Sequence, residues 1–342
     1  MNYSTHAIES LTRFGQTLSF SAPQSAKMAQ HVVRWLDQGI KFSLPDGGNL
    51  VELEQLDPSF FELMRLPYPI CVLEVPFVEH VKNVKGQLDG VLAETASTRR
   101  IALLVECEQF FKDFEPLLKG QPVPSGFVVM SVYYSDPDDM WLMAPQGVVL
   151  NDESAHTLTH HSQEPNRMMI DALAHTGALK PKSSVVQLMH LNLLPEIVKL
   201  LQNEIGPEAA NTRLHLDVRD EVLLAMEFCL VLNCTNIRTR EVLPSAKLNK
   251  KRINSGKLPF YSHHVLEIDS DEVGMRHSLY ASEAAGSGRT VRMHTRRGHL
   301  RRLSTGKVTF VRAALVGRSG GGIISKEYSV SKPQRTSDYS SS

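Results

Sequence analysis

The pattern of apolar and polar residues predicts helices first and strands after them in the first half of the chain. Residues 4–20 and 24–38 repeat apolar positions at helical spacing, and Pro23 and Gly39 mark the ends of the second helix. Apolar runs bounded by turn-forming residues predict strands over 69–75, 101–106 and 127–134, with one or two more over 140–150. We therefore expect an α+β fold in which helices flank a mixed sheet.

The second half of the chain predicts two helices followed by a small sheet. Residues 183–205 have an apolar helical face with a kink expected at Pro195, and residues 217–233 predict a buried helix that is too short to cross a membrane. These two helices would form a helical hairpin. Alternation over 290–294 and 308–311, with turn residues between them, predicts a basic antiparallel sheet against which the helical hairpin packs.

Basic residues are concentrated in that small sheet. Nine arginines and lysines lie in residues 289–318, and no acidic residue occurs in residues 284–326. If the first strand stays regular, alternation places Arg292, His294 and Arg296 on one face. A charge run is usually a solvated surface, but one this dense and free of acids favours a phosphate or an acidic partner.

The candidate interface extends beyond that strand. Gly298 lies between two basic residues, where it would suit a bulge or a close backbone approach. A second group of basic residues accumulates over residues 238–257 in a segment whose composition is typical of a loop, and residues 260–268 predict a strand after it. The residues that we expect to contact nucleic acid or a partner are Arg292, His294, Arg296, Arg297, Gly298, His299, Arg301, Arg302, Lys307, Lys250 and Lys251.

Composition places the chain among folded proteins and limits what its charge can do. It has 342 residues, of which 42% are hydrophobic and 22% charged, and its 37 basic residues balance its 37 acidic ones. Binding to a polyanion is therefore expected to be local. From length and composition we expect a mixed α/β body at 1–165, the helical hairpin and basic sheet at 166–330, and a disordered serine-rich tail at 331–342.

The sequence predicts neither secretion nor a bound metal. Its N-terminus lacks the basic and apolar regions of a signal peptide, and no apolar run approaches the ~18 residues of a membrane helix. The four cysteines lie in apolar or strand-like contexts, which predicts buried free thiols in a reducing cytoplasm. His156, His160 and His161 suggest a metal site, but no zinc-binding spacing accompanies them, so we expect a solvated linker and no cofactor.

Catalytic motifs are weak in this chain. The Gly-x-Ser-x-Gly motif is absent, and the glycine-rich residues 317–322 lack the Lys-Ser/Thr ending of a phosphate loop. His294 and His299, among several arginines, could act as in a ribonuclease, where His moves protons and Arg stabilises an oxyanion. No carboxylate accompanies them, so we favour a non-enzymatic binding protein. A nuclease is the alternative, and a phage structural or DNA-packaging protein is the third hypothesis.

A resemblance to a known family rests on residues 292–299, which read RMHTRRGH. They resemble the C-terminal domain of the mobile-element anti-CRISPR family that acts against production of the type V-A effector nuclease. Members combine an Arg-x-His segment and an Arg-Arg-Gly-His segment with a glycine-containing turn, here at Gly306, and a final strand, here at 314–317. The resemblance extends over residues 222–317. The family commonly has Trp after the second His, where this chain has Leu300.

The resemblance implies a role for the chain. It implies a phage or plasmid protein of the bacterial cytoplasm that recognises the nascent N-terminal peptide of the effector and reduces its messenger during translation. The implied partners are RNA or a ribosome–nascent chain complex, and the host CRISPR effector polypeptide. Leu300 in place of Trp removes a stacking contact, which favours contact with phosphates over contact with nucleobases.

Overall fold

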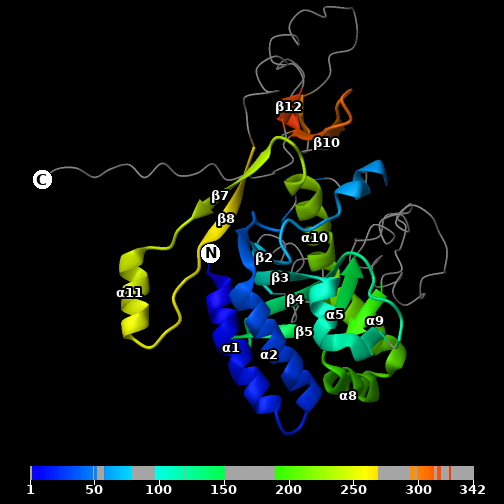
Figure 1. Cartoon of the computed structure of the whole chain (residues 1–342), viewed down its shortest axis with the longest axis vertical. Coiled ribbons are helices and arrows are strands. Elements are labelled where there is room, and N and C mark those ends of the chain that lie inside the picture. The colour runs from blue at the N-terminus through cyan, green and yellow to red at the C-terminus, as the bar shows by residue number, and fades with distance from the viewer. Residues whose placement is uncertain are drawn as a thin grey trace, which may run out of the picture.

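The protein is built around a mixed sheet, seen in a computed structural model that describes residues 2–48, 50–51, 58–78, 97–118, 120–150, 189–268, 293–296, 299–311, 314–316 and 323–324. Eight strands follow the order β6-β5-β4-β3-β2-β1-β8-β7. β1 is parallel to β2 and to β8, and every other neighbouring pair is antiparallel. Helices cover both faces of this sheet (Figure 1). The predicted α+β class with a mixed, helix-flanked sheet is confirmed.

The central strands follow the apolar runs of the sequence. They are β2 (Ile70–Pro76), β3 (Arg99–Glu106), β4 (Phe127–Ser135) and β5 (Met140–Leu150), and the last is one long strand. The chain turns between β4 and β5 with Asp139 at φ +48°, and Ser135 Oγ donates to Asp138 Oδ2 over 2.6 Å. Asp is one of the few residues that tolerate this left-handed conformation, which suits it to the turn.

Successive side chains of these strands enter two separate apolar cores. Val72 and Leu103 pack with helices α1 (Tyr3–Leu18), α2 (Pro23–Gln38) and α5 (Cys107–Phe114). Their neighbours Leu73 and Leu104 point to the opposite face and pack with α10 (Arg219–Leu232). Because both faces of the sheet are buried, its strands are continuously apolar rather than alternating. Short 3₁₀ turns η2 (Pro58–Leu63) and η3 (Glu115–Leu118) complete this part of the fold.

Gly39 ends helix α2 and brings the chain into the sheet. A Cβ atom here would lie 2.7 Å from methyl groups of both Ile70 and Val72, so no larger residue fits without a shift of β2. The next residues form β1 (Ile40–Ser43), a short strand that the sequence did not predict. The two helices predicted before it, over 4–20 and 24–38, are confirmed as α1 and α2.

The helices of the second half differ in part from the prediction. The helix predicted over 183–205 is wrong for residues 189–192, which form the edge strand β6 (Met189–Asn192). Pro195 does not kink a helix but stands in the first turn of α8 (Pro195–Ile205), where its missing N–H costs no hydrogen bond. A further helix, α9 (Pro207–Asp217), was not predicted, whereas the buried helix expected over 217–233 is confirmed as α10.

Residues 237–268 form an arm that projects from the body (Figure 1). It consists of β7 (Ile237–Val242), helix α11 (Ala246–Asn254) and β8 (His263–Ile268), which pairs antiparallel with β7. The loop predicted over residues 238–257 is therefore wrong for β7 and α11, whereas the strand predicted over 260–268 is confirmed as β8. Ser245 caps α11 by accepting a hydrogen bond from the Leu248 amide over 3.4 Å, and helix-forming residues follow it.

The last described strands form two small sheets. β10 (His299–Arg302) pairs antiparallel with β11 (Val308–Val311), while β9 (Met293–Arg296) lies between β12 (Ala314–Val316) and β13 (Ile323–Ile324). The division at residue 165 stays a prediction, although the eight-stranded sheet takes strands from both sides of it. The predicted linker histidines and serine-rich tail lie outside the described residues.

The four cysteines are buried free thiols, as predicted. Burial raises the pKa of Cys71, Cys107 and Cys234 to about 12, and it also raises that of Cys229. These sulfurs therefore remain protonated at neutral pH and act as small apolar groups in the core. In the part of the chain that is described, no helix is long and apolar enough to cross a membrane.

Candidate partner-binding surfaces

The structure distributes the predicted interface residues over three places. His299, Arg301, Arg302 and Lys307 belong to the β10–β11 hairpin, and Lys250 and Lys251 belong to α11. His294 and Arg296 lie in β9, where the backbone alone is described, and Arg292, Arg297 and Gly298 lie outside the described residues. β9 and β10 belong to different sheets. The ribonuclease-like pairing of His294 with His299 stays a prediction.

A tight turn sets the pairing of the basic hairpin. The Leu303 amide donates to the Lys307 carbonyl over 2.8 Å, and the Gly306 amide donates to the Leu303 carbonyl over 2.9 Å. Gly306 has φ +80°, a conformation that glycine adopts without steric cost. So short a turn pairs β11 with the residues just before it, and the prediction that residues 290–294 would be its partner is wrong.

The hairpin is fixed to the end of helix α10. Asn236 Nδ2 donates to the Phe310 carbonyl over 2.8 Å, and the Phe310 amide returns a bond of 2.8 Å to Asn236 Oδ1. The Thr235 amide donates to the Val308 carbonyl over 2.9 Å. Leu300 and Val308 join the core that contains α10. The predicted packing of the helical hairpin on a small basic sheet is thus confirmed for its second helix, α10.

Neighbouring arginines of β10 have opposite roles. Arg302 faces the body, where its Nη2 lies 3.0 Å from both the Ser59 carbonyl and Glu62 Oε1 and its Nη1 donates to the Gly306 carbonyl over 3.1 Å. Arg301 lies on the other face of the strand and is exposed. Side chains one residue apart in a strand point to opposite faces, so Arg302 braces the hairpin while Arg301 is available to a partner. Lys307 is also exposed, at the end of the turn.

The second basic surface is the outer side of α11. Lys247, Lys250 and Lys251 are all exposed, and helical spacing of three and four residues places them along one stripe. Asn249 lies on the other side, where it exchanges two hydrogen bonds of 2.9 and 2.8 Å with the backbone of Phe260. No acidic residue occurs from residue 242 to residue 266, so the stripe has no carboxylate within its own segment.

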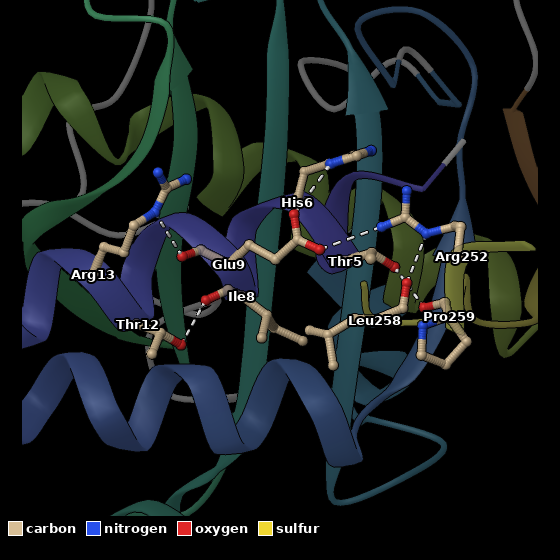
Figure 2. Close-up of polar contacts among 9 residues, drawn as sticks. All are labelled: Thr5, His6, Ile8, Glu9, Thr12, Arg13, Arg252, Leu258 and Pro259. Atoms are coloured by element: carbon tan, nitrogen blue, oxygen red, sulfur yellow. Dashed lines mark hydrogen bonds and ion pairs between the residues drawn. The ribbon is translucent and has the colours of Figure 1, made fainter. Parts of the chain in front are cut away.

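The arm is held against helix α1 by one arginine (Figure 2). Arg252 Nη2 lies 3.3 Å from Glu9 Oε1, its Nε donates to the Leu258 carbonyl over 2.6 Å, and its guanidinium lies 4.1 Å from the centre of the Phe260 ring. Thr5 Oγ1 adds a bond of 3.2 Å to the Pro259 carbonyl. The contacts of Arg252 with Glu9 and of Thr5 with Pro259 join residues more than 240 positions apart in sequence and orient the lysine stripe outward.

Titratable groups where the arm meets helices α1 and α2 carry shifted pKa values. Partial burial of the half-exposed His6 ring, with a smaller contribution from Arg252, lowers its pKa, so this imidazole is neutral at pH 7. Burial lowers the pKa of Lys41 to about 8, against the opposing effect of Asp37. Lys41 Nζ lies 4.0 Å from the centre of the Tyr261 ring, whose hydroxyl donates to Asp37 Oδ1 over 2.6 Å. These groups fix the returning chain of the arm to α2.

The two basic surfaces lie at opposite ends of the β7–β8 ribbon (Figure 1). Asn236 stands directly before β7 at the hairpin end, and α11 follows at the other end. Together they can bind anionic groups at two separated points. Among the described residues, no cluster of His, Cys, Asp or Glu could hold a metal ion. The clamp by Asn236 carries no sequence signal, whereas Ser245 before a run of helix formers could have identified α11.

Comparison with known proteins connects the chain to one family. The sequence model of the AcrVA2-like family, described as the anti-CRISPR type V subtype A2 family, matches residues 50–319. This match includes the central strands, helix α10, the arm and the basic hairpin. No curated protein and no solved structure matches the chain.

Proposed function

The chain belongs to the AcrVA2-like anti-CRISPR family of type V subtype A2, and on this premise we propose that it lowers production of a host type V-A nuclease during translation. Membership gives the chain an anti-CRISPR inhibitor role. The proposal adds the stage at which the chain acts, which is translation. Its target there is the nascent peptide of the nuclease or the messenger being translated. The chain acts in the bacterial cytoplasm by binding, without catalysis, and the β10–β11 hairpin makes the contact.

The observation that supports this proposal most is that the hairpin is fixed to the body while two of its cations stay exposed. Asn236 and Thr235 fix its inner strand to α10, and Arg302 braces it against Glu62. Arg301 and Lys307 remain exposed on this fixed support. Because the backbone that bears them is already fixed, binding has to order only these two side chains, which favours them as contacts for a partner.

The chemistry of the hairpin suits the setting of translation. Arginine and lysine bind phosphate through charge-assisted hydrogen bonds, and a messenger on a ribosome is surrounded by phosphates. Sequence specificity is not expected from phosphate contacts alone, because these position a protein without reading bases. Recognition of one nuclease would therefore come from its nascent peptide, with the basic hairpin holding the protein at the site of synthesis.

The proposal is tested in bacteria that express a type V-A nuclease together with this chain. We expect the wild-type chain to lower both the nuclease protein and its messenger, measured by immunoblot and quantitative PCR. The double variant Arg301→Ala/Lys307→Ala should lower them less. The control Lys112→Ala/Lys199→Ala removes two exposed cations from helices α5 and α8, and it should lower the nuclease and its messenger as the wild type does.

A second experiment distinguishes recognition of the nascent peptide from recognition of the messenger. Synonymous recoding of the first codons of the nuclease keeps the peptide and changes the messenger, whereas a frameshifted and restored leader does the reverse. Loss of inhibition with the altered peptide alone supports nascent-chain recognition. Inhibition of nuclease activity with unchanged nuclease protein and messenger would overturn the proposal.

A further inference from the structure

The arm exposes an unusual share of apolar side chains. Within the described residues, eleven large apolar side chains are exposed, and four of these lie in residues 243–258. Leu243 is 74% exposed, Leu248 44%, Ile253 58% and Leu258 37%. Single exposed apolar residues are common on protein surfaces, but a concentration in one short segment marks an interaction site.

These apolar residues flank the lysine stripe of α11. Leu248 and Ile253 lie on the same nine-residue helix as Lys247, Lys250 and Lys251, and none of its residues is buried. The three lysines form no ion pair with any described residue. The surface thus combines exposed apolar area with positive charge that no described carboxylate neutralises.

A shallow groove continues this surface onto helix α1. It lies between α1 and residues 256–258 and is lined by Ile8, Thr12 and Leu258, among others. Figure 2 shows the side chains of Ile8 and Leu258 directed toward each other at this groove. Because Arg252 holds the arm on Glu9, groove and helix form one fixed surface rather than two independent parts.

We infer that the arm is a docking surface for an acidic polypeptide segment that carries apolar side chains. Carboxylates of the partner meet Lys247, Lys250 and Lys251, and its apolar side chains cover Leu248 and Ile253. Burial of apolar area supplies affinity, while the charges select an acidic partner and exclude a basic one. This inference rests on the arm alone and is independent of the hairpin's proposed role.

The aromatic residues of the arm favour a polypeptide over RNA. Single-stranded RNA is bound by combining positive charge with aromatic rings on which bases stack. Phe260 is covered by the Arg252 guanidinium, and Tyr261 is engaged by Lys41 and Asp37. Leucine and isoleucine gain little from a phosphate backbone, whereas they are typical of helix-in-groove contacts between proteins.

The test selects ligands for the full chain from a display library of random 16-residue peptides. We expect enriched peptides to combine acidic and apolar residues. Binding of the best peptide, measured by fluorescence anisotropy, should weaken about tenfold or more in Leu248→Ser/Ile253→Ser and in Lys247→Gln/Lys250→Gln/Lys251→Gln. Matched controls are Leu200→Ser/Ile205→Ser and Lys27→Gln/Lys112→Gln/Lys199→Gln, which change exposed residues of other helices and should leave binding unaltered.

A 16-nucleotide poly(U) RNA is measured in parallel. If the lysine variant weakens poly(U) binding while the Leu248→Ser/Ile253→Ser variant binds every probe as wild type does, the arm is an RNA contact and the inference is wrong. It is equally wrong if enriched peptides lack acidic residues, or bind both arm variants unchanged. Circular dichroism of each variant establishes that the chain remains folded.

Discussion

The imidazole rings of His190 and His215 lie face to face, with centroids 3.6 Å apart and planes inclined by 19°. His190 comes from the edge strand β6 and His215 from the last turn of α9, so the stack joins the edge of the sheet to a helix. Burial lowers the pKa of both rings, and His215 contributes further to that of His190, which falls to about 4. The rings are therefore stacked as neutral groups at pH 7.

We predict that this histidine pair makes the free energy of unfolding depend on pH below about 6.5. An unfolded His190 takes up a proton near its ordinary pKa, whereas the folded ring does so only near pH 4. The unfolded state binds more protons between these values, so stability falls as the pH falls, by about 3 kcal/mol between pH 7 and pH 4. Urea unfolding of the wild type between pH 7 and pH 4 measures this loss.

The control for this prediction is His190→Gln, which removes the titrating ring. Burial raises the pKa of Asp217 and Glu221, and carboxyl groups shifted in this direction stabilise the fold as pH falls. Their effect is present in both proteins and cancels in the difference. A wild type and variant with the same pH dependence would show that the stack does not contribute.

Phe228→Ala should destabilise the fold by about 3–5 kcal/mol. The ring is fully buried in α10 and meets Phe42 edge to face, with centroids 4.8 Å apart. Its removal leaves a cavity between the helix and the sheet, which the rigid core fills only partly. Thermal or urea unfolding measures the loss, and Leu200→Ala, 63% exposed on α8, should change stability by less than about 0.5 kcal/mol.

Arg301 and Arg302 should respond differently to replacement by alanine. We expect Arg301→Ala to reduce the slope of log affinity against log salt for poly(U) RNA by about 0.7, the value for one phosphate contact on a single strand. Arg302 is occupied by Ser59 and Glu62, so Arg302→Ala should loosen the hairpin and lower its protection from hydrogen exchange. Equal salt slopes in the wild type and Arg301→Ala would contradict the assignment of Arg301 as the exposed contact.

Asn236→Ala should loosen the attachment of the hairpin to the body. It removes both hydrogen bonds to the backbone of Phe310, and an unmade bond at such a site costs about 1–3 kcal/mol. We expect the Phe310 amide to exchange at least about tenfold faster, since 1.4 kcal/mol corresponds to a factor of ten. Asn236→Asp keeps the acceptor for this amide and should have a smaller effect there. Unchanged exchange in both variants would show that apolar packing alone holds the hairpin.

The sequence predicted the elements whose pattern depends on local burial. Helices α1, α2 and α10 and strands β2 to β5 have continuous or periodic apolar positions, and these residues are buried. The prediction failed where tertiary contacts decide the conformation. Residues 189–192 are compatible with a helix, but they pair with residues 146–149 of β5 and form an edge strand.

Charge patterning located the candidate surfaces but not their organisation. It identified Arg301 and Arg302 together, because nothing in the sequence shows that Glu62, 240 positions away, binds the second of them. Likewise, the basic residues after Asn236 suggested a loop, because no local apolar pattern marks α11. The stability of this helix depends instead on the contacts of Asn249 and Arg252. Long-range polar contacts of this kind are specified by the fold rather than by neighbouring residues.

The junction between β1 and β8 consists of a single residue pair, Phe42 with His264, whereas β8 pairs with β7 along six residues. The sheet therefore has a seam, and the two strands of the arm adhere to each other better than they adhere to the rest. Mechanical load on the arm would separate β8 from β1 at this seam, and the other six strands would stay paired. The contacts of Arg252 with Glu9 and of Tyr261 with Asp37 therefore carry much of the attachment, and the arm should open as one piece only after they break.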